Sequence, residues 1–371
     1  MIASQKLQRL AIFVADMGGG GAERSMLNLA RGFAKRGHSV DLVLARAEGQ
    51  FLNDLPDDVR VIDLNASRVI KSLPGLMRYL RREKPDGMVS SVDYVNIVAL
   101  WARRLSGART KLVINEQNQL SVLSANSPLR RQRMMPKLAR RFYKWANAII
   151  AVSEGVKADL ETVLRLPPER IDVIYNPSVD QSQVHAAAKL EVEHPWFQDQ
   201  QIPTILAAGR LTAQKDYPTL LRAFARVRAE KRARLVILGE GEDRSQLESL
   251  VRELGIGEDV SLPGFAGNPF AYMARASLFV MSSRWEGLPT VLVEALCCGA
   301  PVVSTDCPSG PREILKDPRC SRLVPVSDVN ALSDAIISAL DGKLRKPERE
   351  SWLPFEMDII TDRYLAIMLE R

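Results

Sequence analysis

Residues 10–45 read LAIFVADMGGGGAERSMLNLARGFAKRGHSVDLVLA, and the order of their apolar and polar positions decides the fold class. Residues 10–16 and 39–45 are almost wholly apolar, as strands buried on both faces are. Residues 22–37 between them have the spacing of an amphipathic helix that ends at Gly37. A strand, a helix and a second strand in this order predict a parallel sheet covered by helices.

The same alternation runs through the rest of the chain in two successive sets. In the first set we expect a helix at 73–85 and strands at 59–64, 87–91, 110–116, 147–154 and 170–177. The second set predicts strands at 204–210, 233–241, 259–265, 278–283 and 301–306 and helices at 217–230, 244–255, 289–299 and 329–340. The polar residues 190–201 between the two sets are typical of a linker.

Two sets of similar rhythm predict two doubly wound, Rossmann-like α/β domains in tandem. A chain of 371 residues also exceeds the size at which single hydrophobic cores stop growing. We place the domains at 1–185 and 186–354, and we expect a helix at about 355–371 to return to the first domain. In such folds ligands bind outside the carboxyl ends of the strands. The expected site is therefore a cleft where the two domains face each other.

The formal net charge of +7 is concentrated in the first half, where residues 1–180 carry 28 Lys and Arg against 18 Asp and Glu. This excess indicates an anionic partner, either a membrane surface or a phosphorylated substrate. No apolar run approaches the roughly 18 residues of a membrane-spanning helix. The apolar residues 10–15 lack the cleavage pattern of a signal peptide, so we expect a cytoplasmic protein.

The four cysteines do not form a recognisable metal or disulfide motif. They contain no CxxC pair, and no histidine lies near them in sequence: Cys297, Cys298, Cys307 and Cys320. We expect reduced thiols in a cytosolic core and no metal site.

A run of glycines, Gly18 to Gly21, follows the first expected strand and precedes the first expected helix. It matches neither GxGxxG nor GxxxxGK, which weakens the nicotinamide-dinucleotide and P-loop interpretations. Glycines there still let the backbone approach a ligand closely, and the helix N-terminus favours an anion. A tight turn without a ligand explains the run equally well.

Two cations follow the first expected strand of the second set. Arg210 comes directly after the strand, and Lys215 lies five residues later, before a helix. Such cations would neutralise the charge that grows on a departing diphosphate. No DxD pair occurs in the sequence to hold a divalent ion there, so we expect basic side chains to replace a metal. The alternative is a pair of solvated loop cations.

Residues 284–294, RWEGLPTVLVE, place one carboxylate before an expected helix and another two turns into it. The amides near Leu288 and Thr290 can bind phosphate at the positive end of the helix dipole. Glu286 could then reach sugar hydroxyls, and Glu294 could accept hydrogen bonds from ribose hydroxyls. The apolar surroundings of Glu294 predict burial, and a buried carboxylate needs a partner. A capping acid and a surface glutamate are the alternative.

Together these stretches resemble the retaining glycosyltransferases of family 4, which have the GT-B fold. The resemblance covers nearly the whole chain and includes GGGGAERSMLNLARGFAKRGHSVDLV, AVSEGVKADL, VIYNP, EGLPTVLVEALCCGAPVVSTD and SGPREIL. It implies transfer of a hexose or N-acetylhexosamine from a UDP-sugar, with retained anomeric configuration and no metal cofactor. In the implied site Arg210 and Lys215 bind the diphosphate, Glu286 the donor sugar and Glu294 the ribose, while Gly20 and Gly21 pass close to the reaction centre.

The sequence departs from this family at one position. Many members carry a histidine after a first-domain strand, where this chain reads LVINEQNQLS, and its histidines are His38, His185 and His194. Glu116 or Asn118 would occupy the place of that histidine. A carboxylate at Glu116 could orient an acceptor hydroxyl or take its proton. A loop carboxylate without a chemical role is the alternative.

The stretch SPLRRQRMMPKLARRFYKWANA at 127–148 is strongly basic and contains no acid. Its apolar and aromatic residues interleave with the cations, although Pro136 should interrupt a single continuous helix. Such a segment suits an anionic membrane surface. The cations that would bind the inner face of the plasma membrane are Arg130, Arg131, Arg133, Lys137, Arg140, Arg141 and Lys144. A solvated face covering the core is the alternative, and no motif supports nucleic-acid binding.

The favoured function is transfer of a sugar to a lipid-linked or polysaccharide acceptor by a peripheral enzyme. Two alternatives keep the same donor chemistry. One is a GT-B-fold nucleotide-sugar epimerase or phosphorylase, and the other is a non-catalytic nucleotide-sugar-binding partner of another transferase. The combination of Arg210, Lys215, Glu286 and Glu294 in one sequence argues against the second.

Overall fold

The computed structural model describes residues 7–18, 20–199 and 201–370, and these form two units. Unit 1 comprises Met1–Ser178 and Met357–Arg371, and unit 2 comprises Val179–Glu356. The boundary lies seven residues before the predicted position 185, which falls inside helix α7 (Gln181–Ala188). Helix α7 packs against helices of unit 2, so its contacts assign the whole helix to that unit.

The sheet of unit 1 has seven strands in the order β3-β2-β1-β4-β5-β6-β7, and every neighbouring pair is parallel. This order reverses between β1 and β4, as in doubly wound folds. The strands are β1 (Arg9–Val14), β2 (Ser39–Leu44), β3 (Val59–Asp63), β4 (Gly87–Ser91), β5 (Lys111–Glu116), β6 (Ala148–Ala151) and β7 (Ile171–Val173).

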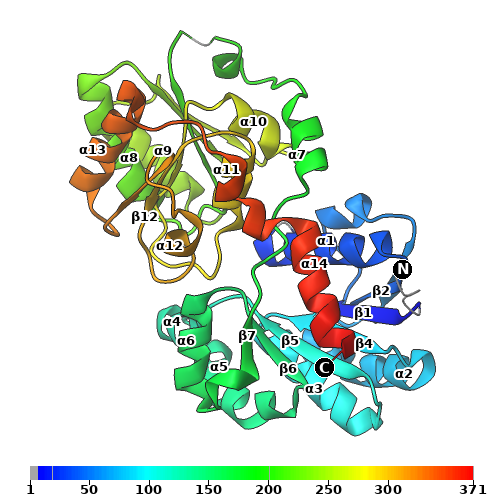
Figure 1. Ribbon diagram of the computed structural model, residues 1–371. Helices are drawn as coiled ribbons and strands as arrows, with labels where there is room; N and C mark the ends of the chain where they lie inside the picture. Colours follow the sequence, from blue (N-terminus) through cyan, green and yellow to red (C-terminus); the bar gives the residue numbers. More distant parts are fainter. Residues whose placement is uncertain (1–6, 19, 200, 371) are drawn as a thin grey trace. The chain divides into compact units, whose positions relative to one another are not determined.

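Helices cover both faces of this sheet (Figure 1). Alternate residues of β1, Leu10 and Ile12, join the core under α1 and α14, because side chains alternate between the faces of a strand. Asp41 of β2 points to the other face, where it accepts a hydrogen bond from Tyr79 of α2 at 2.7 Å. The helices of unit 1 are α1 (Gly21–Lys35), α2 (Leu73–Glu83), α3 (Asp93–Ser106), α4 (Leu120–Asn126), α5 (Arg130–Phe142), α6 (Glu154–Leu164) and α14 (Met357–Leu365).

Helix α14 lies directly against α1. The C-terminal helix therefore packs on the first domain, as the sequence predicted. A Cβ atom at Gly32 would lie 2.1 Å from Thr361 Oγ1, so only a glycine permits this approach. Further along the helix, Tyr364 is fully buried and its hydroxyl accepts a hydrogen bond from Asn115 Nδ2 at 2.7 Å. The terminal helix is therefore part of the core of unit 1.

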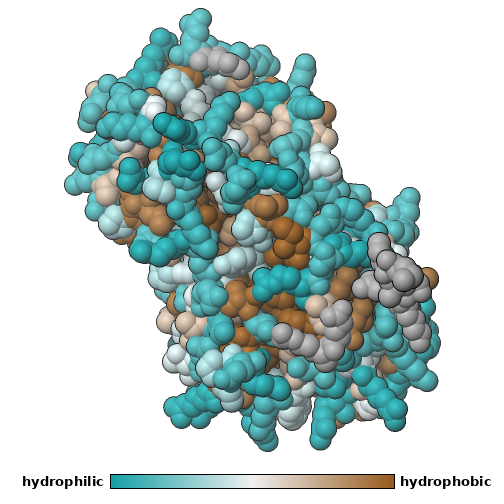
Figure 2. Space-filling view, in the orientation of Figure 1, coloured by the Kyte–Doolittle hydropathy of each residue, from teal (hydrophilic) through white to brown (hydrophobic). Residues whose placement is uncertain are grey.

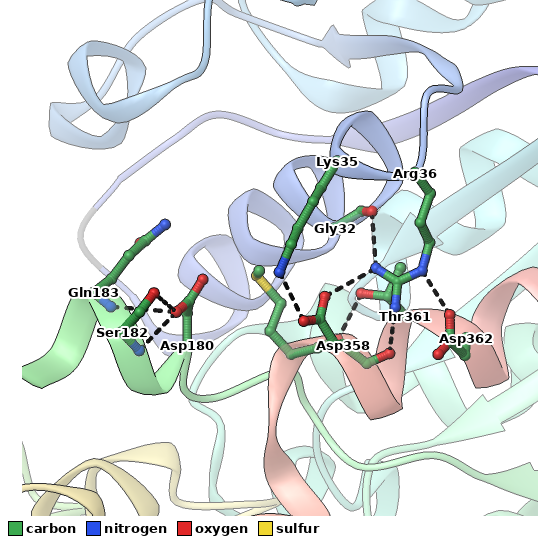
Figure 3. Close-up of polar contacts among 10 residues, drawn as sticks. Gly32, Lys35, Arg36, Asp180, Ser182, Gln183, Asp358, Thr361 and Asp362 are labelled. Carbon is green, nitrogen blue, oxygen red and sulfur yellow. Dashed lines mark hydrogen bonds and ion pairs between the residues drawn. The ribbon is translucent and has the colours of Figure 1, made fainter.

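Ion pairs hold the exposed edge of this contact, as Figure 3 shows. Lys35 Nζ lies 2.7 Å from Asp358 Oδ2. Arg36 contacts Asp358 Oδ1 at 3.1 Å and Asp362 Oδ1 at 2.6 Å. Because three of these side chains are well exposed, each pair adds only a fraction of a kcal/mol, roughly 0.2–1. Burial of Ile360 and Tyr364 contributes more to holding α14 than the charges do.

Unit 2 repeats the same architecture with six strands in the order β10-β9-β8-β11-β12-β13, again parallel throughout. The strands are β8 (Thr204–Ala208), β9 (Arg234–Leu238), β10 (Val260–Gly264), β11 (Leu278–Met281), β12 (Val302–Thr305) and β13 (Ser321–Val324). The α-helices are α7 (Gln181–Ala188), α8 (Tyr217–Glu230), α9 (Arg244–Glu253), α10 (Pro269–Arg275), α11 (Thr290–Cys297), α12 (Pro311–Ile314) and α13 (Val329–Ser338).

The polar segment 190–201 is not a linker, because it lies inside unit 2. Phe197 is buried and its ring packs edge-to-face on Tyr272 of α10, with the ring centres 5.1 Å apart. His194 Nε2 is hydrogen-bonded to Ser261 Oγ at 3.0 Å. This ring contact and this hydrogen bond fix a stretch whose composition alone suggests a connection between domains. Helix α7 precedes this segment, and Asp180 caps its N-terminus by accepting hydrogen bonds from the amides of Ser182 and Gln183 (Figure 3).

Hydrophilic side chains dominate the face drawn in Figure 2, and hydrophobic ones form limited groups. In the part of the chain that the structure describes, no helix is both long and apolar enough to cross a membrane.

Candidate functional site

Two residues predicted to surround a diphosphate contact each other in unit 2. Lys215 lies in the loop between β8 and α8, and Glu286 lies in the loop between β11 and α11. Lys215 Nζ donates to Glu286 Oε1 at 2.6 Å, and Gln214 Nε2 donates to Glu286 Oε2 at 3.3 Å. Glu286 is only 8% exposed, so these donors replace the water that would otherwise solvate its charge.

The position of this pair is the one where doubly wound folds bind ligands. Strands β8 and β11 are neighbours, and the strand order of unit 2 reverses between them. Loops that leave the carboxyl ends of such a pair diverge to opposite faces and leave room for a ligand. Sequence alone placed Lys215 and Glu286 at strand ends, and the sheet order brings those two ends together.

Backbone hydrogen bonds and side chains fasten the two loops to each other. The Arg284 amide donates to the Gln214 carbonyl at 2.8 Å, and the Ser282 hydroxyl donates to the Lys215 carbonyl at 2.8 Å. Gln214 Nε2 also donates to the Trp285 carbonyl at 2.8 Å. The backbone that carries Lys215 is therefore fixed relative to the backbone that carries Glu286.

Glycine is required where the loop leaves β8. Gly209 has φ 156, and Gly239 at the end of β9 has φ 137. A Cβ atom at Gly239 would lie 2.0 Å from the Gly209 carbonyl oxygen, so no other residue fits there. Arg210 follows Gly209 directly and is exposed at this edge of the sheet. Its side chain is in the same loop as Lys215, as the sequence predicted.

The remaining predicted residues of unit 2 lie at the start of α11. Thr290 is the first residue of this helix, so its amide has no acceptor within the helix. Leu288 is buried, and a Cβ atom at Gly310 would lie 2.4 Å from Pro289 Cδ, which shows how tightly the turn is packed. Glu294, in the second turn, is 4% exposed, and its predicted burial is confirmed.

The cysteines of this unit are free thiols. Burial, together with the nearby Glu294 carboxylate, raises the pKa of Cys297 to about 12. This thiol therefore remains protonated at neutral pH and is a poor nucleophile. Among the described residues, no group of three or more His, Cys, Asp or Glu side chains could hold a metal ion.

In unit 1 the glycine run lies between β1 and α1, although Gly19 is outside the described residues. Gly20 has extended backbone, with φ −90 and ψ 165, and precedes Gly21, the first residue of α1. A Cβ atom at Gly20 would meet the Glu23 carboxylate at 2.2 Å. Because Gly20 and Gly21 follow β1, they come after a strand that borders the point where the strand order of unit 1 reverses, between β1 and β4.

Glu116 ends β5, and its carboxylate lies inside unit 1. It is 1% exposed and accepts a hydrogen bond from the Tyr143 hydroxyl at 2.6 Å. Burial, assisted by the nearby Asp93 carboxylate, raises the pKa of Glu116 well above its usual range. A raised pKa favours the protonated form of Glu116, so action as a base would require substrate to change the surroundings of this carboxyl group.

Asp93 is a second buried carboxylate, which the sequence analysis missed. It begins α3 at the carboxyl end of β4, is 6% exposed and has its pKa raised by burial. Val92 before it has φ 68 and ψ 150, a conformation that β-branched residues avoid. Strain of this kind concentrates at functional sites. The sequence signal was an Asp two residues after an expected strand, but only the strand order shows that this strand is the neighbour of β1, which precedes the glycines.

The buried acid leads to a prediction for stability against pH. Folded Glu116 holds its proton more tightly than the unfolded chain does, so wild-type stability falls as pH rises above the ordinary carboxyl pKa. Glu116→Gln keeps an acceptor for Tyr143 but has no proton to lose. We expect the variant to gain stability relative to wild type between pH 5.5 and pH 8.5, by up to about 1.4 kcal/mol per pH unit. Urea unfolding at both pH values measures the difference, and a pH-independent difference would contradict the raised pKa.

The basic segment forms helix α5, which runs from Arg130 to Phe142 without a break. The predicted interruption at Pro136 is therefore wrong, since the helix loses only the one hydrogen bond that Pro136 cannot donate. Met135 and Ala139 are buried against the rest of unit 1. The seven cations are all exposed: Arg130, Arg131, Arg133, Lys137, Arg140, Arg141 and Lys144. Leu129 and Met134 among them are 45% and 54% exposed.

Comparison with known proteins matches two family models to successive parts of the chain. The model described as Glycosyltransferase Family 4 matches residues 19–180. The model described as Glycosyl transferases group 1 matches residues 191–352. Among solved structures, Anabaena HepE in complex with UDP and glucose has a TM-score of 0.81 and 19% identity, covering 98% of this chain and all of that one. The lipopolysaccharide glycosyltransferase WaaG has a TM-score of 0.72 and 17% identity, covering 98% and 100%. These likenesses confirm the GT-B fold.

Sequence relatives reach higher identity. A Campylobacter jejuni protein, N-acetylgalactosamine-N,N'-diacetylbacillosaminyl-diphospho-undecaprenol 4-alpha-N-acetylgalactosaminyltransferase, is 32% identical over 353 residues, 92% of each chain. The lipopolysaccharide core biosynthesis glycosyltransferase LpsE of Rhizobium meliloti is 25% identical, over 95% of this chain and 96% of that one. With nearly its full length matched at this level, the chain belongs to the glycosyltransferases of family 4.

Proposed function

We propose that this glycosyltransferase transfers an N-acetylhexosamine or hexose from a UDP-sugar to a polyprenyl-diphosphate-linked or other lipid-anchored glycan. The reaction would retain the anomeric configuration and need no metal ion. The observation that carries the proposal is the pair of joined loops in unit 2, with Lys215 and Glu286 in contact ahead of the N-terminus of α11. The 32% identical Campylobacter transferase, whose name gives a diphospho-undecaprenol-linked acceptor, supports this choice of acceptor.

In this proposal unit 2 binds the donor. Lys215, Arg210 and the amides near Leu288 and Thr290 neutralise the diphosphate as its negative charge grows. Glu286 contacts the sugar and keeps Lys215 in place, and Glu294 accepts hydrogen bonds from the ribose. Basic side chains and backbone dipoles would then do the work that a divalent ion does in other transferases.

Unit 1 would bind the acceptor close to Gly20 and Gly21. The bond between the anomeric carbon and the diphosphate breaks, and a bond to the acceptor oxygen forms on the same face of the sugar. The proton of the acceptor hydroxyl passes to a base, for which Glu116 remains the sequence-based prediction. In that role Glu116 would exchange its contact with Tyr143 for a contact with the acceptor.

A thermal-shift panel of nucleotide sugars tests the donor, followed by turnover of the best stabiliser with a polyprenyl-diphosphate-linked N-acetylhexosamine. We expect UDP-sugars to stabilise the protein and product to form equally with and without EDTA. Isomerisation of the donor without transfer would favour the epimerase alternative. Nucleotide binding without turnover on any acceptor would favour the non-catalytic one. Absence of binding by every UDP-sugar would remove the proposal.

We also propose that α5 holds the enzyme on the inner, anionic face of the plasma membrane. Six exposed cations lie on α5, the exposed Lys144 follows it directly, and the exposed Leu129 and Met134 belong to the same short segment of unit 1. Each basic residue near an anionic surface contributes about 1 kcal/mol, and apolar side chains among them add burial in the interface.

A charge-matched pair of variants tests the membrane site. Changing Arg130, Arg131 and Arg133 to Gln is expected to weaken binding to vesicles with anionic lipid at least tenfold, since about 3 kcal/mol of attraction is removed. The control changes three exposed cations of unit 2 to Gln: Arg252, Arg322 and Lys343. It should bind like wild type. Flotation measures both, and equal recovery of the two variants would show that net charge, not α5, drives the binding.

A further inference from the structure

Asp216 occupies an unusual place beside the proposed diphosphate site. It follows Lys215 directly and is 1% exposed. Its backbone has φ 48 and ψ 44, the left-handed region that non-glycine residues rarely adopt. A buried carboxylate in strained backbone is costly unless its charge is well compensated.

The Asp216 carboxylate accepts hydrogen bonds from three separate segments of unit 2. Arg284, after β11, contacts it with two nitrogens, Nη2 at 3.1 Å from Oδ1 and Nε at 3.1 Å from Oδ2. The Thr219 hydroxyl in the first turn of α8 donates to Oδ2 at 2.9 Å. The Ser327 hydroxyl, in the loop after β13, also donates to Oδ2 at 2.9 Å.

The Ser327 contact is informative because this residue too has left-handed backbone, with φ 58. Two strained, non-glycine residues, in the loops after the non-neighbouring strands β8 and β13, thus meet through their side chains. Loops that were free to relax would lose this geometry, so the hydrogen bonds must hold both backbones in place.

From these contacts we infer that Asp216 is a positioning residue for transfer, tying the loops after β8, β11 and β13 into one rigid frame that aims Lys215 and Glu286 at the diphosphate. This inference rests on the proposed function. Asp216 does not contact the ligand itself. It acts through Arg284, whose backbone amide is bonded to Gln214, and through the fixed backbone of its neighbour Lys215.

Two substitutions separate the carboxylate from the backbone conformation. Asp216→Gly permits the left-handed backbone without strain but removes every side-chain contact. Asp216→Asn keeps the shape and tolerates this backbone, but its neutral oxygen binds the Arg284 guanidinium less strongly. The matched control is Asp259→Asn, which weakens the contact of Asp259 Oδ2 with Arg228 Nε at 2.7 Å elsewhere in unit 2.

The experiment measures UDP affinity by calorimetry and the steady-state constants for the UDP-sugar that best stabilises the protein. We expect Asp216→Gly to weaken UDP binding about tenfold. We expect it to lower kcat as well, because misplaced cations stabilise the growing charge of the departing diphosphate less well. The KM for acceptor should not change. Asp216→Asn should recover part of the loss, and Asp259→Asn should behave like wild type. Adding Arg284→Gln to Asp216→Gly should cost little more, since the two residues act as a pair.

The outcomes distinguish this inference from the proposed function. If UDP binds wild type and is lost in Lys215→Ala but unchanged in Asp216→Gly and Asp216→Asn, the positioning role is wrong and the proposed function stands. If wild type binds no UDP, both are overturned. Should Asp216→Gly fail to fold, Asp216→Asn carries the test, and wild-type constants in that folded variant would overturn the inference.

Discussion

Lys215→Ala is expected to lower the rate of sugar transfer about 100- to 1000-fold, the usual effect of removing one preorganised group that stabilises developing negative charge. The lysine ammonium lies at the point where the strand order of unit 2 reverses, in contact with Glu286 Oε1 at 2.6 Å. Without it the diphosphate would lose a cation, and among the described residues Glu286 would keep the Gln214 side-chain amide as its hydrogen-bond donor. UDP binding should weaken together with the rate.

Steady-state transfer and UDP calorimetry test this prediction. Lys231→Ala is the matched control, because Lys231 also forms an ion pair in unit 2, with Asp341 Oδ1 at 2.5 Å, but it follows α8 at the opposite end of that helix. The control should retain wild-type activity. Circular dichroism and thermal unfolding check that both variants are folded. A Lys215→Ala enzyme that works at the wild-type rate would refute the assignment of the diphosphate site.

The second large effect is expected at Glu294. A carboxylate that accepts from ribose hydroxyls in a site from which water is excluded contributes a charged hydrogen bond, so Glu294→Ala should weaken UDP binding roughly tenfold to a hundredfold. Because Glu294 is 4% exposed within an apolar helix, the alanine fits without burying a new polar group.

The ligand itself supplies the sharper test. Wild type should bind UDP at least tenfold more tightly than a 2′,3′-dideoxy analogue, whereas Glu294→Ala should bind both about equally. Glu294→Gln, which can still accept one hydrogen bond, should show intermediate discrimination. If the variants keep the full preference for the ribose hydroxyls, another residue recognises the ribose, and Glu294 is a structural carboxylate of α11.

Most of the fold follows from the sequence, because nearly every strand of a parallel sheet is a continuous apolar run. Strand β13 was missed because it lacks such a run: two of its four residues, Ser321 and Arg322, are polar. The interruption predicted at Pro136 failed because a proline removes one hydrogen bond but leaves the rest of the helix intact. The linker at 190–201 was misassigned because, among its described residues, just Val192 and Phe197 are buried in an otherwise polar stretch.

The site was less predictable than the fold. Strand-end patterns and the family resemblance predicted Lys215, Glu286 and Glu294 as candidate site residues, but not which groups touch. Asp216, Arg284 and Ser327 come from three distant stretches, and only the order of the strands brings them together. For Glu116 the sequence predicts a position at the end of a strand, whereas its raised pKa depends on burial beside Tyr143 and Asp93.

The packing of α14 against α1 has a consequence for how the protein is made. Ile360, Tyr364 and Met368 complete the same apolar core as β1 and α1, yet the ribosome synthesises them after the whole of unit 2. Unit 2 is continuous in sequence and can fold as soon as it emerges. The nascent first unit, by contrast, must wait with one flank uncovered until α14 has been synthesised.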